Sequence, residues 1–181
     1  RGRRRRRMKN KLILAALILL SFLLQCTVLQ TFAIGSISAN LLVILCVSMG
    51  LLRGKKTGMF TGFFCGILVD LFYGPVFGLY ALIYMYLGYF SGFGCKIYYD
   101  DDMKVPMCFV GIGDLLYNFA VYGLQFLLRG RLGFGTYFLK IMIPELLYTV
   151  LLTLLVYKLL YTINYRFMGM RTTKDSDSFW L

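Results

Sequence analysis

The stretch that most constrains the fold lies between Thr57 and Leu82, where two apolar runs are separated by one short turn. Glycine recurs every four residues in the first run, at Gly58, Gly62 and Gly66. On a helix, residues four apart lie one turn above another, so these glycines open a groove into which a neighbouring helix can press its backbone. The spacing therefore predicts an apolar helix that packs closely against a neighbour.

A single carboxylate, Asp70, continues the same spacing, and Gly74-Pro75 then ends the helix before a second run begins at Gly78. An ionisable side chain in a membrane needs partners, and a helix C-terminus disfavours an anion. Backbone N–H groups between Phe72 and Gly78 are suitable donors, so we expect Asp70 to fix the turn. A catalytic or ion-binding role is the alternative. The predicted packing and turn motif comprises Gly58, Gly62, Gly66, Asp70, Gly74, Pro75 and Gly78.

The composition indicates a membrane protein, because 59% of the 181 residues are hydrophobic. The chain contains no histidine, which excludes His-based catalytic triads, metal sites and proton shuttles. Its five cysteines are scattered singly, a pattern more typical of small apolar residues within helices than of a disulfide framework. Nucleotide-binding and hydrolase motifs are absent from the sequence. We therefore expect no cofactor and no metal.

Apolar runs of about the length that crosses a bilayer predict an all-α polytopic membrane protein with six transmembrane helices. These form a single membrane domain over residues 12–161, preceded by a basic N-terminus at 1–11 and followed by a polar tail at 162–181. The predicted spans are residues 12–32, 37–52, 57–73, 76–95, 105–128 and 135–161.

Lysine and arginine counts predict the orientation, because cytoplasmic loops carry the excess. With a cytoplasmic N-terminus, the inside segments hold eight (1–11), three (53–56), two (96–104) and four (158–181) of the twenty basic residues. The outside turns hold only Arg129 and Arg131, and Lys140 lies just inside the sixth predicted span. Both termini are thus predicted to be cytoplasmic. An arginine-rich run precedes Met8, which leaves open whether residues 1–7 are native. Such a run can bind nucleic acid, but the favoured interpretation is a membrane protein with no nucleic-acid partner.

Polar residues also lie inside the last two predicted spans, at helical spacing. One interpretation is a substrate cavity or proton path between these spans. The favoured one is an interhelical polar seam, in which the carboxyl groups are protonated or hydrogen-bonded. Pro144 lacks an N–H and is expected to kink the sixth span. The candidate seam comprises Asp114, Asn118, Gln125 and Glu145.

The central part of the chain resembles the MreD family of bacterial rod-shape-determining membrane proteins. In that family, an apolar run and a basic loop precede a glycine-rich helix that ends in L-x-D, followed by G-x-x-x-G-L-x-A-L. The resemblance covers residues 38–94, and the positions that match the second half of the pattern are Asp70, Gly74, Gly78, Leu79, Ala81 and Leu82. The family often has Pro-Asp or Pro-Asn where this chain has Ala39-Asn40.

The resemblance implies a non-enzymatic component of the elongasome in the bacterial cytoplasmic membrane, which supports lateral peptidoglycan synthesis. It implies MreC as the direct partner and MreB, RodA and a class B penicillin-binding protein as indirect ones, alongside membrane lipid. It also implies the fold of the substrate-binding S components of energy-coupling-factor vitamin transporters, so an S component is the alternative function. A membrane enzyme acting on lipid-linked precursors is a third and less supported hypothesis.

An aromatic surface beside the turn is the candidate contact for the MreC-like partner. It is compact and lies where the third predicted span meets the fourth. Its residues are Phe72, Tyr73, Phe77 and Tyr80.

Overall fold

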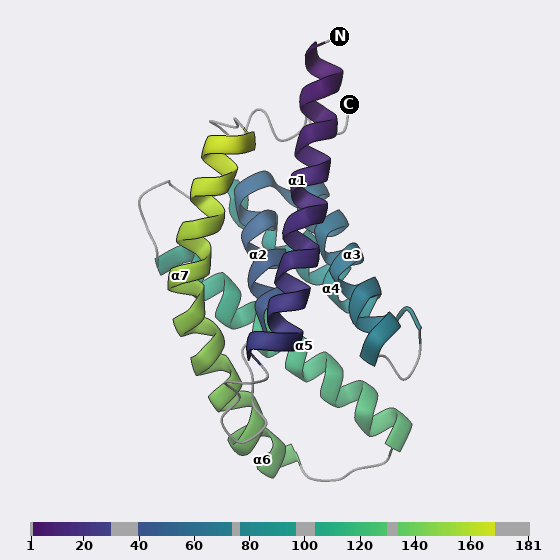
Figure 1. The fold of residues 1–181 in the computed structure, drawn as a ribbon. Helices are drawn as coiled ribbons and strands as arrows, with labels where there is room; N and C mark the ends of the chain where they lie inside the picture. The colour runs from purple at the N-terminus through teal and green to yellow at the C-terminus, as the bar shows by residue number, and fades with distance from the viewer. Residues whose placement is uncertain (1, 30–39, 74–76, 97–103, 130–133, 169–181) are drawn as a thin grey trace.

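The computed structural model describes residues 2–29, 40–73, 77–96, 104–129 and 134–168, and over these ranges the chain contains helices and no strand (Figure 1). The predicted all-α class is confirmed. The helices are α1 (Gly2–Leu24), α2 (Leu41–Arg53), α3 (Lys55–Tyr73), α4 (Leu79–Ser91), α5 (Lys104–Arg129), the short α6 (Phe134–Tyr137) and α7 (Ile143–Met168).

Among the residues that the structure describes, three segments are long and apolar enough to cross a membrane: Met8–Thr27, Lys104–Leu124 and Gly135–Arg166. Helices α2 and α4 are apolar but shorter. Two of the three long segments include a π-helical turn, Gln25–Leu29 after α1 and Phe138–Met142 before α7.

Helix α2 is the core of the molecule, because it contacts α1, α3, α4, α5 and α7 (Figure 1). Every residue from Leu41 to Leu51 is buried. A helix that is apolar on all sides is stabilised when other helices cover every face, which explains why this short helix lies in the centre.

Both ends of α2 are held by polar contacts. At its start, the Asn40 side chain accepts a hydrogen bond from the Val43 N–H (3.3 Å), and Gln25 Oε1 accepts one from the Leu42 N–H (3.0 Å). At its end, the buried Arg53 donates from Nε to Asn164 Oδ1 of α7 (2.7 Å). A cation is favoured at a helix C-terminus, so Arg53 stabilises the end of α2 while it joins α2 to α7.

The last predicted span is distorted just before Pro144, as its missing N–H leads one to expect. The Ile143 N–H reaches the carbonyl of Phe138, five residues back, which makes a π-helical turn instead of a regular α-helical one. Helix α7 then continues to Met168, beyond the expected end of the span at residue 161.

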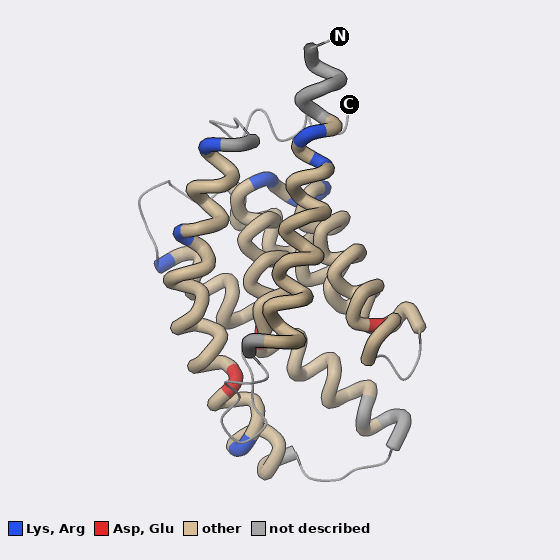
Figure 2. The backbone as a smooth tube through the Cα atoms, viewed as in Figure 1, with Lys and Arg blue, Asp and Glu red and all other residues tan. Residues whose placement is uncertain are grey.

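The start of α1 and the end of α7 lie at the same end of the bundle (Figure 1). Most lysines and arginines of the described ranges gather toward this end (Figure 2). Helices α1, α2, α3 and α4 alternate in direction relative to this end (Figure 1).

Candidate functional site: the α3–α4 unit

Helices α3 and α4 form the most extensive helix pair in the described structure, and the spaced glycines of α3 lie in their contact. A Cβ atom at Gly62 would collide with the backbone carbonyl of Tyr84, and one at Gly66 with the backbone of Ala81. At Gly58 it would meet the carbonyl of Gly88. The two backbones therefore touch at three successive turns of α3. They approach so closely at these positions that only glycine fits on α3.

Helix α2 joins the same contact through a second set of glycines. A Cβ at Gly50 would lie 2.9 Å from the Gly88 carbonyl oxygen, and one at Gly58 would lie 2.7 Å from the Gly50 Cα. The Cys46 thiol donates to the Tyr84 carbonyl (3.3 Å). Sequence reasoning missed Gly50 and Gly88. The four-residue spacing of Gly88 and Gly92 was the available signal for a glycine face on α4.

Asp70 caps the start of α4 from the neighbouring helix. Its Oδ1 accepts a hydrogen bond from the Tyr80 N–H (3.1 Å) and its Oδ2 from the Ala81 N–H (2.8 Å). These N–H groups belong to the first turn of α4, where no helical carbonyl is available to them. Gly78 precedes α4 with φ +100° and has no side chain to cap it. An acidic side chain at a helix N-terminus also interacts favourably with the helix dipole.

The donors to Asp70 lie just beyond the segment in which the sequence placed them. We expected N–H groups between Phe72 and Gly78, whereas the structure uses the next helix. Gly74 and Pro75 lie outside the described residues.

The four aromatic residues beside this turn do not share one environment. Phe72, Tyr73 and Phe77 are exposed, and the Phe72 ring lies 5.2 Å from that of Phe22 on α1. Tyr80 is half-buried. Its ring faces Tyr117 of α5 at 6.4 Å.

A pocket of about 210 Å³ opens between the ends of α1 and α3 and the starting turn of α4. Its polar lining comes from Gln25, Tyr73, Tyr80 and Tyr117, beside Cys26 and two apolar side chains.

A polar cluster that the sequence did not predict lies at the centre of the bundle. Asn40 is its hub: its Oδ1 accepts from the Tyr84 hydroxyl (3.1 Å), and its N–H donates to the Thr149 hydroxyl (3.2 Å). All three side chains are buried. The cluster joins α2, α4 and α7, so it fixes the α3–α4 unit against the rest of the bundle. An Asn directly before an apolar run was the signal for a helix cap, but not for its distant partners.

The structure brings three members of the predicted polar seam together between α5 and α7. Asp114 and Asn118 are buried, and the Asn118 side-chain amide donates to the backbone carbonyl of Asp114 (3.1 Å). Glu145 is half-buried and interacts electrostatically with Asp114. Gln125 lies on α5, but its side chain falls outside the described part.

The two buried aspartates differ in one respect that can be tested. Asp70 accepts two hydrogen bonds, whereas neither carboxylate oxygen of Asp114 has a hydrogen-bond partner in the described structure. Burying a polar group without a partner costs roughly 1–3 kcal/mol by protein mutational data.

Asp114→Asn replaces one unpartnered polar group with another of the same shape, so we expect it to leave the melting temperature in detergent nearly unchanged. Asp70→Asn is the matched comparison and should lower it. A fall at Asp114→Asn as large as at Asp70→Asn would show that the Asp114 carboxylate has a stabilising partner.

Within the described ranges, no group of three or more Cys, Asp or Glu side chains is arranged to hold a metal ion.

Three comparisons relate this chain to known proteins. Searches of curated proteins and of solved structures found no significant match. A scan against protein-family models matched the rod shape-determining protein MreD over residues 5–169. This match extends the resemblance of residues 38–94 to almost the whole chain, and the chain therefore belongs to the MreD family of rod shape-determining proteins.

Proposed function

We propose that this chain is a non-enzymatic, multi-pass component of the elongasome in the bacterial cytoplasmic membrane. It binds an MreC-like single-span protein and through it supports lateral peptidoglycan synthesis. MreB, RodA and a class B penicillin-binding protein are its indirect partners. The family's role in rod shape determination carries this proposal.

The geometry of the α3–α4 unit supports a scaffolding role. Glycine contacts and the Asp70 cap hold the two helices rigidly, and rigid elements present a docking surface with little loss of entropy on binding. The exposed residues at this end, Phe72, Tyr73 and Phe77, are aromatic, and aromatic side chains are enriched at the energetic centres of interfaces. We place the partner contact there.

Co-purification from native membranes tests the proposal. A tagged chain should capture the MreC-like protein, and Phe77→Ala should reduce the capture because Phe77 is 71% exposed and its truncation leaves the core intact. Phe90→Ala is the matched control: Phe90 is 59% exposed but lies near the other end of α4. Capture of no cell-wall protein by the wild-type chain would overturn the proposed function. Equal loss in both variants would overturn the placement of the contact.

The proposal includes six membrane spans with both termini in the cytoplasm. Reporter fusions at Leu181 should be active only as cytoplasmic reporters, and fusions between α5 and α6 only as extracytoplasmic ones. An extracytoplasmic C-terminus would contradict the six-span arrangement.

The pocket beside Tyr73 and Tyr80 favours a second candidate function, a substrate-binding S component of an energy-coupling-factor transporter. Its lining provides hydroxyl and amide groups for polar contacts with a ligand, and its volume of about 210 Å³ limits that ligand to a small molecule. In that case the tagged chain should co-purify with a pair of ATPases, and small-molecule uptake should depend on it.

A further inference from the structure

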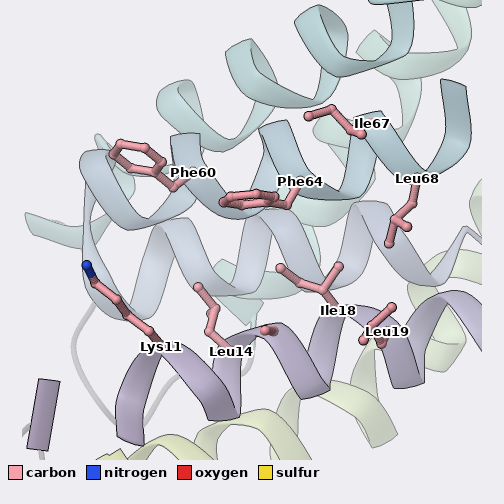
Figure 3. A pocket seen from close by; sticks show the side chains of 9 residues that line it. Lys11, Leu14, Ile18, Leu19, Phe60, Phe64, Ile67 and Leu68 are labelled. Carbon is pink, nitrogen blue, oxygen red and sulfur yellow. The ribbon is translucent and has the colours of Figure 1, made fainter. Parts of the chain in front are cut away.

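An apolar groove runs between α1 and α3, on the side of α3 away from the glycine face (Figure 3). It has a volume of about 450 Å³. Leu14 and Ile18 contribute from α1, and Phe60, Phe64 and Leu68 from α3. Lys11 lies at one end and is the only lining residue of the described chain with a polar side chain.

The groove lies beside α1, whose apolar segment is mostly unburied, as are the other two long apolar segments. Only 22% of the apolar segment of α1 is buried inside the molecule, although the segment is long enough to span a bilayer. Phe60 and Phe64 line the groove and are 36% and 52% exposed. Apolar surface of this kind is covered in a membrane by an acyl chain or by another helix.

The length of the groove favours an acyl chain. Its lining on α1 extends from Lys11 to Leu19, which is about 12 Å of helix at 1.5 Å per residue. A spanning helix would need a surface along the whole hydrocarbon core, about 30 Å thick. The groove therefore matches part of one lipid chain that enters from a single leaflet.

The positive charge at the Lys11 end of the groove indicates which kind of lipid headgroup would bind there. Lys11 is exposed. Two further lysines are exposed as well: Lys9, two residues before Lys11 in α1, and Lys56, one helical turn before the lining residue Phe60 in α3. Lysine side chains extend toward the headgroup level of a membrane, where they attract anionic phosphates.

We propose that the groove between α1 and α3 binds one anionic phospholipid, with an acyl chain along Leu14, Ile18 and Phe64 and the phosphate beside Lys11. The bound lipid bridges α1 and α3 and so completes the packing of the first helix. The site does not depend on the MreC contact or on the cell-wall role.

The test uses the full chain, purified in mild detergent and depleted of lipid. Phosphatidylglycerol should raise its melting temperature more than phosphatidylcholine at equal concentration, and native mass spectrometry should detect one retained phosphatidylglycerol. Lys11→Ala should lower the apparent affinity for phosphatidylglycerol about five-fold, the contribution of one lysine near an anionic surface. Lys158→Ala removes an exposed lysine from α7 and should bind like the wild type.

A second variant tests the groove itself. Ala15 is an exposed lining residue, so Ala15→Trp fills the groove without disturbing the core and should reduce lipid retention. Equal stabilisation by the two lipids, or unchanged binding in both Lys11→Ala and Ala15→Trp, would overturn the proposal. A lipid-free dimer that Ala15→Trp dissociates would overturn it in favour of a second copy as the occupant.

Discussion

Gly62→Ala is expected to lower the stability of the purified protein strongly, and Gly62→Leu is expected to prevent the accumulation of folded protein. Even a single methyl group at this position collides with the Tyr84 carbonyl and lies 2.9 Å from the Cys46 sulfur, so two backbones must move apart. Overpacking in a close contact costs about 1–3 kcal/mol, and here backbone rather than a flexible side chain must move. Thermal unfolding in detergent measures the effect.

Gly123 supplies the matched control, because it is also helical but a Cβ there would meet no atom within 4 Å. Gly123→Ala should leave the melting temperature unchanged or raise it slightly, because alanine has the higher helix propensity. Gly88→Ala should resemble Gly62→Ala, since a Cβ at Gly88 meets the Gly58 carbonyl from the opposite helix. Once one substitution has separated the helices, the other should add little. The loss of stability in the Gly62→Ala, Gly88→Ala double variant should therefore be smaller than the sum of the two single losses. Equal melting of Gly62→Ala and Gly123→Ala would contradict the contact.

The α3–α4 contact illustrates what the sequence can predict. Glycine at four-residue intervals on a helix is typical of a close approach by another helix, so the periodicity of Gly58, Gly62 and Gly66 indicates which face of α3 is packed. The glycine spacing does not predict which helix packs against that face. Several apolar helices were available, and α4 was selected by a complementary glycine face that includes Gly88.

The central polar cluster illustrates what the sequence could not predict. Asn40 and Thr149 are separated by 109 positions, and each is unremarkable by itself: one precedes a helix and the other is a threonine within one. Their hydrogen bond depends on the packing of α2 against α7, which local patterns do not encode. The burial of Arg53 has the same origin, since its side chain reaches Asn164 on α7 instead of the solvent.

Helix boundaries were predicted within a few residues where a charge or a proline marks them. The start of α5 at Lys104 and the end of α2 at Arg53 are examples. The last span was predicted less well, because Pro144 signals a distortion without specifying its form. The structure resolves it as a π-helical turn before α7.

Asp70→Leu is expected to have the second large effect, because it removes both acceptors from the start of α4. The N–H groups of Tyr80 and Ala81 would then have no partner, and an unsatisfied buried donor costs roughly 1–3 kcal/mol. Asp70→Asn keeps one acceptor oxygen and loses the charge, so its melting temperature should fall between those of the wild type and Asp70→Leu. Glycine packing along the rest of α3 should still hold the two helices together.

The same variants connect the cap to the proposed interface. The first turn of α4 carries Tyr80 and is preceded by Phe77, so loss of the cap should displace the aromatic end while the protein still inserts. Capture of the MreC-like partner should therefore decrease from wild type to Asp70→Asn to Asp70→Leu when all are compared at matched membrane levels. Equal capture by the wild type, Asp70→Asn and Asp70→Leu would contradict both the capping role of Asp70 and the proposed place of the interface.

Comparison with Phe77→Ala separates a contact from a displacement. Phe77 is exposed and outside the core, so its truncation should reduce capture without lowering the melting temperature, whereas Asp70→Leu should lower both. If Asp70→Leu no longer captures the partner but Phe77→Ala still does, the Asp70 cap positions a surface of α4 other than the one that includes Phe77. If the chain is instead a transporter component, Asp70→Leu should impair small-molecule uptake and leave partner capture intact, because the carboxylate also fixes Tyr80 at the wall of the 210 Å³ pocket.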